Sequence, residues 1–179
     1  AAVLVDPEFR NRGIATRLVG HALEALADCS CVKLDAAPAG QAIYRKLGFV
    51  EEYGISRMVC DCLPPTRPTG PTVQRVTLND LDRAAARDRL ALGVSRRSVL
   101  AALLKRAPST AWKLRTGSSL RAACFGRDGS RYHQIGPVIA DNLDDATAVV
   151  SKALHNLVGR AVVVDVPDAQ TGMKEWLSA

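Results

Sequence analysis

The chain has 179 residues, of which 47% are hydrophobic and 23% charged, and its formal net charge is +6. This composition is ordinary for a soluble globular protein, and no apolar run approaches the roughly 18 residues needed to span a membrane. The start of the chain also lacks the basic and apolar segments of a signal peptide. We therefore expect a soluble, cytoplasmic protein that does not bind a membrane.

The first segment alternates predicted strands and helices. The apolar run Val3–Val5 predicts a strand, and apolar side chains recur at helical spacing from Ile14 onwards. The later elements are a strand at 32–34, a helix at 41–47 that Gly48 ends, and a last strand pattern at 49–62. This order predicts an α/β unit.

A basic, glycine-containing turn separates the first strand from the first helix. Gly13 lets the backbone approach a bound group closely, and the small Ala15 leaves the backbone N–H groups of 11–16 unshielded at the positive end of a helix. Three cations flank this turn: Arg10, Arg12 and Arg17. The turn predicts an anion site, and the alternative is a solvated basic loop.

Prolines mark a boundary between two segments. Residues 64–71 contain four of the nine prolines, which predicts a linker between a domain at 1–63 and a second domain at 72–179. The basic excess belongs to the front of the second domain, because residues 75–131 carry thirteen Lys or Arg and only four Asp or Glu. Such an excess suits an acidic ligand, nucleic acid or no specific partner.

The second segment has a longer series of elements. Thr77 with Asp80 is a capping signal for a helix at 78–91, and Ser95 caps a second helix that ends near Lys105. The predicted strands lie at 73–76, 110–115, 120–125, 132–139 and 161–166, and further helices lie at 143–157 and from Met173 onwards.

Two motifs in the first segment resemble those of the GNAT superfamily of N-acetyltransferases. Residues 5–18 (VDPEFRNRGIATRL) are similar to its acetyl-CoA pyrophosphate motif, and 34–40 followed by 44–49 (YRKLGF) are similar to its second motif. In the second segment, 135–141 and 163–167 resemble the acetyltransferase-like C-terminal domain of one GNAT subgroup. The resemblance implies a mixed α/β (α+β) fold, with the C-terminal half of one GNAT domain followed by a second GNAT-like domain.

The same resemblance implies an acyltransferase that moves an acetyl group, or another acyl group that is not aminoacyl, from acetyl-CoA to an amine. The backbone of the first strand would pair with the pantetheine arm through Val3, Leu4 and Val5. The pyrophosphate would lie on the backbone of Arg10, Asn11, Arg12, Gly13, Ile14, Ala15 and Thr16. Tyr44 matches the family tyrosine that acts as general acid to the departing thiolate, and the alternative is a packing role for its ring.

The sequence departs from the family pattern in three places. Ala37 stands where many members have an asparagine that contacts the pantetheine. The family's first three strands and two helices would precede residue 1, and the last helix has no stop signal, so we expect a fragment and assign no general base. The second domain has 141–146 (DNLDDA) in place of the basic loop, and its carboxylates would repel a pyrophosphate. We expect that domain to complete the acceptor site or to support the first domain, without acetyl-CoA of its own.

Other interpretations concern binding rather than catalysis. Residues 80–105 have the helix, glycine turn and basic second helix of a DNA-binding helix-turn-helix, which predicts a regulatory protein as the alternative function. The two Cys-x-Cys pairs allow a four-thiolate metal site, although we favour reduced structural thiols and expect no metal. Three histidines are interpreted as structural or exposed: His21, His133 and His155. We expect a small-molecule or peptide amine as partner, and a homo-oligomer stays open.

Overall fold

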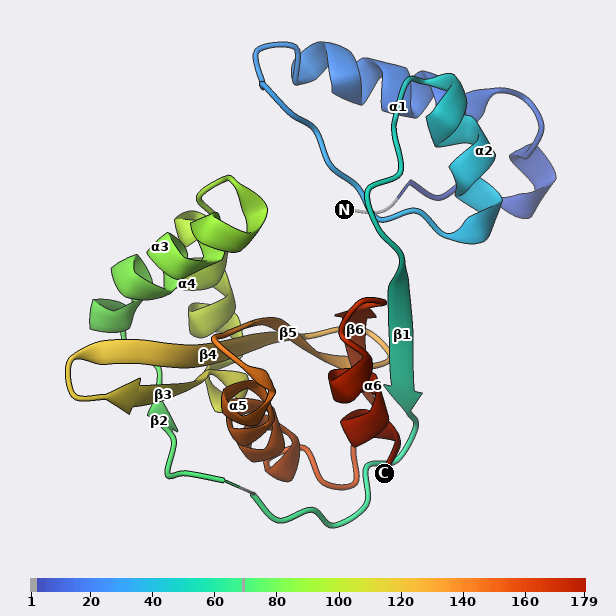
Figure 1. The fold of residues 1–179 in the computed structure, drawn as a ribbon. Coiled ribbons are helices and arrows are strands. Elements are labelled where there is room, and N and C mark those ends of the chain that lie inside the picture. The colour runs from blue at the N-terminus through green and yellow to red at the C-terminus, as the bar shows by residue number, and fades with distance from the viewer. Residues whose placement is uncertain (1–2, 69) are drawn as a thin grey trace. The chain divides into compact units, whose positions relative to one another are not determined.

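The computed structural model describes residues 3–68 and 70–179. The chain forms two compact units, the first of residues 1–52 and the second of residues 53–179. Among the described residues, no helix is long and apolar enough to cross a membrane. Each unit has its own secondary structure (Figure 1).

The first unit consists of helices joined by irregular chain. It contains the 3-10 helix η1 (Pro7–Phe9), the helix α1 (Ile14–Ala25) and the helix α2 (Pro38–Lys46). The predicted helices are therefore present, but the predicted strands at 3–5 and 32–34 are wrong, since the described residues of this unit contain no strand. A strand needs a neighbour to satisfy its backbone groups, and no other segment of the unit pairs with either run. Val19 is the one buried residue among those described in this unit.

A mixed six-stranded sheet forms the centre of the second unit. Its strands are β1 (Ile55–Cys60), β2 (Gln74–Arg75), β3 (Trp112–Thr116), β4 (Ser119–Asp128), β5 (His133–Ala140) and β6 (Val162–Pro167), in the order β1-β6-β5-β4-β3-β2. Neighbouring strands are antiparallel except β5 and β6, which run parallel. The parallel pairing covers only 133–135 of β5, and the rest of β5 pairs with β4 alone. The mixed α/β fold expected from the sequence is confirmed.

Strand β1 belongs to this sheet rather than to the first unit. It pairs with β6 from Ile55 opposite Pro167 to Cys60 opposite Val162. The Arg57 guanidinium reinforces the pairing by binding Asp165 with two hydrogen bonds of 2.7 and 2.9 Å. The boundary between the compact units therefore falls between residues 52 and 53. The sequence, in contrast, predicts that this strand is the last one of the first domain, before the proline-rich linker. The domain limits 1–63 and 72–179 stay a prediction.

Helices cover both faces of the sheet and enclose two hydrophobic cores (Figure 1). The helices of the second unit are α3 (Leu81–Leu92), α4 (Arg97–Arg106), α5 (Leu143–His155) and α6 (Thr171–Ser178), with short 3-10 helices η2 (Leu78–Asp80) and η3 (Pro108–Thr110). Alternate residues of β4 serve the two cores, because Cys124 packs with α5 and Phe125 packs with α3 and α4. Each core is closed by one pair of helices, so the second unit is stabilised on both sides of its sheet.

A buried charged group fixes the start of α3. The carboxylate of Asp80, which is 2% exposed, accepts hydrogen bonds from the backbone N–H of Thr77 at 2.8 Å and from its hydroxyl at 2.6 Å. The buried Lys113 of β3 also donates to it. Burial alone would raise the pKa of Asp80, but the hydrogen bonds from Lys113 and Thr77 and the charge of Lys113 outweigh burial and lower it. The capping box predicted at Thr77 and Asp80 is confirmed.

Candidate functional site

The turn before α1 is held by short-range contacts. Asp6 caps η1 by accepting the backbone N–H of Glu8 at 3.0 Å. The Arg10 Nε donates to the Val5 carbonyl at 3.2 Å, and the Arg12 guanidinium lies 5.2 Å from the centre of the Phe9 ring. These contacts fold residues 5–12 back on themselves and lead the chain into α1.

Two left-handed residues complete the turn. Asn11 has φ 62° and Gly13 has φ 72°, and Gly13 occupies the N-cap position of α1. Glycine is required there because this region of backbone space is strained for most other residues. A Cβ added to Gly13 would meet no atom within 4 Å, so the constraint on this position comes from the backbone angle rather than from crowding.

The N-terminus of α1 is uncapped. Gly13 offers no side chain to the first turn, and the first backbone hydrogen bond of the helix runs from the Arg17 N–H to the Gly13 carbonyl at 3.0 Å. The three preceding N–H groups have no acceptor within the helix: Ile14, Ala15 and Thr16. They lie at the positive end of the helix dipole, and Thr16 is exposed.

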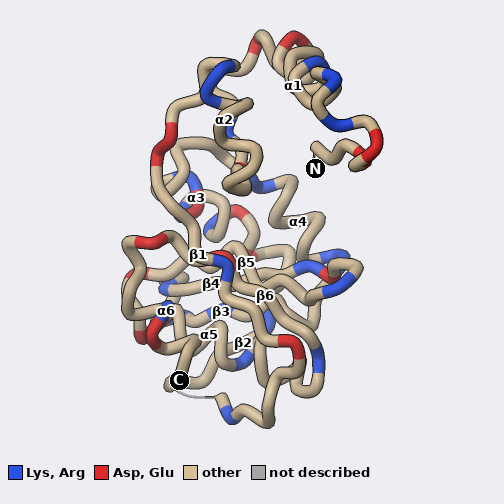
Figure 2. The backbone as a smooth tube through the Cα atoms, turned by 90° about the vertical axis from the view of Figure 1, so that its right-hand side faces the viewer, with Lys and Arg blue, Asp and Glu red and all other residues tan. Residues whose placement is uncertain are grey.

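Basic residues predominate in and next to the first turn of α1. The first turn of α1 contains no acidic residue, and three exposed arginines surround it: Arg10, Arg12 and Arg17. Figure 2 shows this group of basic residues at the beginning of α1. Cations beside the positive end of a helix repel it, and a bound anion relieves that repulsion. The donors and charges of the turn therefore fit a phosphate or pyrophosphate group.

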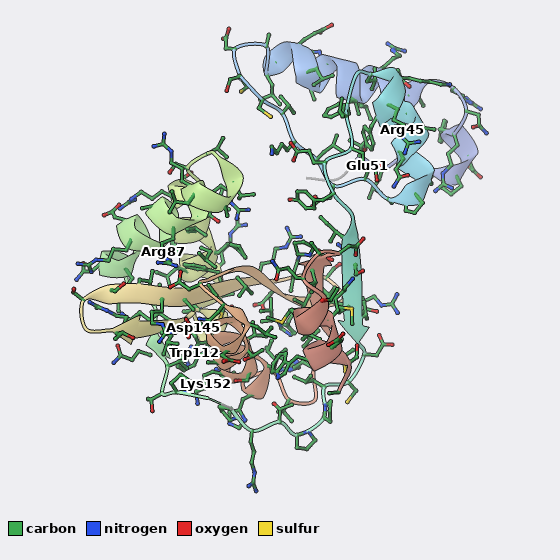
Figure 3. The ribbon with its side chains drawn as sticks, viewed as in Figure 1. Arg45, Glu51, Arg87, Trp112, Asp145 and Lys152 are labelled. Carbon is green, nitrogen blue, oxygen red and sulfur yellow. The ribbon has the colours of Figure 1, made fainter. Side chains whose placement is uncertain are left out.

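The second predicted motif, 44–49, forms the C-terminal cap of α2. Gly48 has φ 87°, its N–H donates to the Arg45 carbonyl at 3.1 Å, and the Phe49 N–H donates to the Tyr44 carbonyl at 3.1 Å. These two bonds define a Schellman motif, in which the residue after the glycine contacts the last turn of the helix. Accordingly, the Tyr44 and Phe49 rings meet edge to face with centroids 5.8 Å apart. An ion pair of 3.0 Å between Arg45 and Glu51 continues the contact beyond the cap (Figure 3).

The cap fixes the ring of Tyr44 and leaves its hydroxyl available. A Cβ on Gly40 would lie 2.9 Å from the Tyr44 ring, so glycine one turn earlier makes room for it. The side chain is half-buried, and its hydroxyl forms no hydrogen bond within the described part of the chain. Neither a hydrogen bond nor an ion pair between described residues joins Tyr44 to the turn at 10–16. The assignment of Tyr44 as general acid stays a prediction, and its ring has the packing role that was the alternative.

Helix α5 of the second unit begins in the opposite way. Asn142 caps it by accepting the Asp145 N–H at 2.9 Å, and Asp144 and Asp145 supply negative charge to the first turn. Asp145 is 3% exposed and pairs with Arg121 at 2.8 Å, while Arg87 pairs with Asp141 just before the helix. Figure 3 labels Asp145 in the first turn of α5 and Arg87 on α3. The protein's own side chains therefore supply the cap and the charge that α1 lacks.

The helices of the predicted helix-turn-helix pack on the sheet. Gly93 has φ 79° and caps α3, and Leu100 and Leu104 of α4 are buried against the sheet. Asp88 binds Arg96 between the helices with bonds of 2.7 and 2.8 Å. The hydrogen bonds that Arg96 donates to the Asp88 carboxylate are the main cause that raises the pKa of Arg96. No feature of these helices tests the DNA-binding interpretation, which stays a prediction.

The cysteines and histidines form no recognisable metal centre. Within residues 3–68 and 70–179, no three His, Cys, Asp or Glu side chains lie close enough together to bind a metal ion. Burial raises the pKa of the Cys124 thiol to about 12, so this thiol is inert at neutral pH. The other four cysteines are free and at least partly exposed.

The second unit contains a concave region that no sequence motif indicates. Four arginines line a pocket there and come from three parts of the chain, namely β1, α4 and the β4–β5 hairpin: Arg57, Arg106, Arg127 and Arg131. Their spacing forms no motif, and the basic excess over 75–131 was the only signal in the sequence.

The protein has a mixed sheet between two helical layers and an uncapped basic turn. Comparison with known proteins identifies the family that has these features. A family model described as the acetyltransferase (GNAT) domain matches residues 84–179, and a second model with the same description matches residues 1–51. The first match covers more than half of the chain. The chain therefore belongs to the GNAT acetyltransferase family.

Curated relatives are similar over almost the whole chain. An uncharacterized N-acetyltransferase, YitH, from Bacillus subtilis (strain 168) is 21% identical over 98% of this chain and 62% of its own length. A holothin acyltransferase from Pseudoalteromonas sp. (strain SANK 73390) is 26% identical over 94% of this chain and 57% of its own length. The chain thus spans about 60% of the length of these relatives.

Solved structures share the fold. A putative acetyltransferase from Pyrococcus horikoshii superposes with a TM-score of 0.73 at 25% identity, over 97% of this chain and 57% of that protein. A GNAT-type N-acetyltransferase from Sphaerobacter thermophilus superposes with a TM-score of 0.58 at 16% identity, over 97% of this chain and 66% of that protein. The second likeness concerns the fold alone.

Proposed function

We propose that the protein containing this chain transfers an acetyl group from acetyl-CoA to an amine, and that the turn before α1 holds the pyrophosphate of acetyl-CoA. The observation that carries this proposal is the uncapped N-terminus of α1. Its free N–H groups and three arginines need an anion, and the GNAT fold implies the use of acyl-CoA in general. The N–H groups would donate to the phosphate oxygens, and Arg10, Arg12 and Arg17 would balance their charge.

The proposed reaction is a direct transfer. The amine nitrogen attacks the thioester carbonyl carbon, a C–N bond forms, the C–S bond breaks, and the sulfur leaves with the electron pair. Tyr44 donates its phenolic proton to the departing thiolate, which yields the free thiol of CoA. The attacking nitrogen loses its extra proton to bulk water, and Tyr44 is reprotonated from the same source. The Schellman cap would hold the Tyr44 ring in place for this step.

The acceptor is proposed at the level of its chemistry. The names of the two relatives, an N-acetyltransferase and a holothin acyltransferase, support acyl transfer as the reaction class. We propose a small-molecule or peptide amine as acceptor, and acetyl as the transferred group. In this proposal the second unit supports the first or completes the acceptor site, because its own helix α5 has no basic, uncapped terminus.

A thiol-release assay with Tyr44→Phe tests this function. The full-length protein is incubated with acetyl-CoA and a panel of primary amines, and free CoA is measured as thiol. With the amine that gives turnover, we expect Tyr44→Phe to lower kcat at least about tenfold while KM for acetyl-CoA changes less than about twofold, since Phe keeps the edge-to-face contact with Phe49 and removes only the proton donor.

The matched control is Tyr53→Phe, which removes a hydroxyl from an exposed tyrosine. It should leave both constants unchanged. An unchanged kcat in Tyr44→Phe would remove Tyr44 from the reaction, and an absence of thiol release with every amine would contradict the proposed activity itself.

A further inference from the structure

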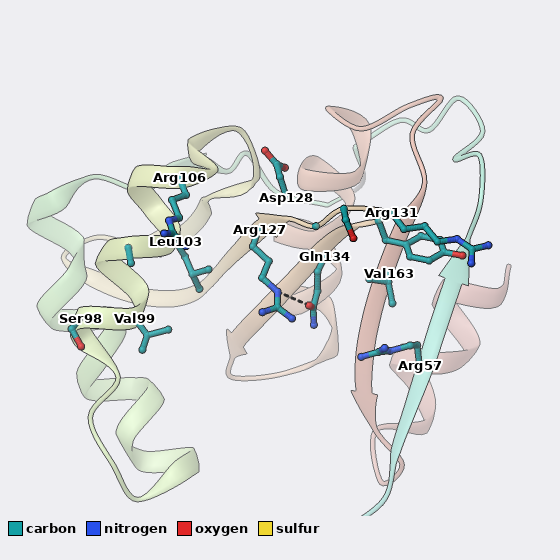
Figure 4. A pocket seen from close by; sticks show the side chains of 14 residues that line it. Arg57, Ser98, Val99, Leu103, Arg106, Arg127, Asp128, Arg131, Gln134 and Val163 are labelled. Carbon is teal, nitrogen blue, oxygen red and sulfur yellow. Dashed lines mark hydrogen bonds between the residues drawn. The ribbon is translucent and has the colours of Figure 1, made fainter. Parts of the chain in front are cut away.

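The second unit contains a pocket of about 930 Å³ whose lining includes no residue of the turn before α1 or of α2. One wall is the exposed side of α4, a second is the turn between β4 and β5, and the third comes from β6 and β1 (Figure 4). Its volume falls within the range of small-molecule sites in proteins. The pocket is built entirely from residues of one compact unit.

The polar lining of this pocket is strongly basic. It includes four arginines, Arg57, Arg106, Arg127 and Arg131, against a single carboxylate, Asp128. That carboxylate is already engaged, because the His133 Nδ1 lies 2.7 Å from its Oδ1. In Figure 4 the side chains of Arg57 and Arg127 extend from their strands into the space between α4 and β1. Positive charge therefore dominates the concave surface.

Hydrogen bonds hold part of this lining in place. Gln134 accepts the Arg127 Nε at 2.8 Å and donates to Asp165 at 2.8 Å, and Asp165 also binds Arg57. Among the described residues, Arg106, Arg127 and Arg131 form no ion pair. Within the part of the chain that the structure describes, the Arg127 guanidinium binds only through its Nε, so its terminal N–H groups are available to another partner.

Part of the pocket lining is apolar. Val99, Ala102 and Leu103 come from α4, and Val163 comes from β6. Val99 is 48% exposed, whereas its neighbour Leu100 is buried on the side of α4 that faces the sheet. An apolar surface beside several arginines suits a ligand with an apolar body and a negatively charged group.

We propose that this pocket binds a small organic oxyanion, a carboxylate or a phosphate ester carried on an apolar body. The arginine forks bind the oxyanion, because guanidinium groups match the geometry of carboxylate and phosphate oxygens. The apolar body covers Val99, Leu103 and Val163 and is removed from water. All residues of this site belong to the second unit.

Calorimetric titration of the full chain with three naphthalene probes tests the site. The probes are 1-naphthyl phosphate, 1-naphthoate and the neutral 1-naphthol, which share one apolar body. We expect at least one anion to bind at least about tenfold more tightly than 1-naphthol, because only the anions engage the arginines. The comparison of the two anions shows which oxyanion the pocket accepts.

Two substitutions and a neighbouring control locate the binding. Arg127→Met keeps the side-chain stem and removes the charge, and Arg106→Glu reverses a charge that has no partner among the described residues. Each should weaken the anion at least about tenfold. Lys105→Glu makes the same charge change in the same last turn of α4, but Lys105 does not line the pocket, and its effect should stay below about twofold.

Three results would overturn the proposal. The first is equal affinity for 1-naphthol and both anions. The second is an equal loss of anion affinity in Arg106→Glu and Lys105→Glu, which would indicate binding through the overall positive charge of the protein or at the turn before α1. The third is salt-dependent binding of duplex DNA that Arg106→Glu abolishes while neither naphthalene anion binds, which would make the basic surface a nucleic-acid site.

Discussion

Helices α1 and α5 differ in how their N-termini are capped. Each has N–H groups in its first turn that lack acceptors within the helix. In α5, Asn142 accepts one of them and Asp144 and Asp145 balance the dipole, whereas α1 has glycine at its N-cap, no acid in its first turn and arginines around it. The difference shows that the N-cap residue and the charges of the first turn distinguish a helix N-terminus that the protein caps itself from one that is available to an anion.

The two units also differ in how they are stabilised. The second unit has two hydrophobic cores and buried charged groups, while Val19 is the one buried residue described in the first. Large apolar side chains of the first unit are exposed, with Leu4 at 84% and Leu18 at 50%. The predicted cofactor turn thus lies in the unit with little core, and the second unit carries most of the stabilising burial.

The largest predicted effect concerns the stability of the second unit. Asp80→Asn should lower its free energy of unfolding at pH 7 by about 3 kcal/mol, because the buried Lys113 would lose its counterion. Chemical denaturation measures this change. The pKa of Asp80 is lowered in the fold, so its ionic contribution is present above the ordinary pKa of 3.8 and is lost as pH falls through the lower folded value.

The difference between wild type and Asp80→Asn should therefore shrink below about pH 3.8. Asp82→Asn is the control, because it breaks an exposed ion pair between Asp82 of α3 and Arg97 of α4 and should change stability little. A difference that stayed constant down to pH 2 would contradict the assignment to Asp80. We expect Asp80→Asn to leave acetyl-CoA affinity unchanged at pH 7, because Asp80 stabilises the second unit and the proposed acetyl-CoA site lies in the first.

The next largest effect comes from giving α1 the acid that α5 has. Ala15 and Asp144 both occupy the second position of their helices. Ala15→Asp should weaken acetyl-CoA binding at least about 100-fold, since a carboxylate would compete for the free N–H groups and repel the pyrophosphate. The same change should stabilise α1 slightly. Acetyl-CoA affinity measured by calorimetry should therefore fall, while the midpoint of thermal unfolding should rise.

Asp144→Ala is the reciprocal control in α5. It should cost the second unit about 0.3 to 1 kcal/mol of stability through the helix dipole and leave acetyl-CoA affinity unchanged. Weaker acetyl-CoA binding in Asp144→Ala, or unaltered binding in Ala15→Asp, would contradict the proposal that acetyl-CoA binds at the start of α1 and not at the start of α5.

A smaller effect is expected from the backbone of the turn. Gly13→Val should weaken acetyl-CoA binding about tenfold, because a β-branched residue disfavours φ 72° and would shift the N–H groups of the first turn. Gly93→Val imposes the same strain at φ 79°, also with no atom within 4 Å of the added Cβ, but at the end of α3. Equal effects of both substitutions on acetyl-CoA affinity would show that the loss comes from general destabilisation.

Local sequence signals predicted the helices and the turns well. Periodic apolar positions located α1 and α5 within a few residues, the capping box at Thr77 and Asp80 is present, and Gly48 ends α2. Each of these features depends on residues close together in the chain. The basic turn was recognised for the same reason, whereas Tyr44 was singled out by its match to a family motif.

Long-range pairing could not be predicted in this way. The runs at 3–5 and 32–34 have the composition of strands, but a strand forms only where a partner is available, and the first unit offers none among its described residues. Strand β1 was expected in the first domain and instead pairs with β6, more than 100 residues later in the chain. The pocket arginines formed no sequence signal because three separate segments, β1, α4 and the β4–β5 hairpin, bring them together.

The stoichiometry of acetyl-CoA binding tests the contrast between α1 and α5 most directly. Calorimetric titration of the full-length protein should give one acetyl-CoA site per chain, and Ala15→Asp should abolish it. Two sites per chain, or a single site that survives Ala15→Asp and is lost on substitution at the start of α5, would contradict the assignment of the cofactor to the uncapped turn before α1.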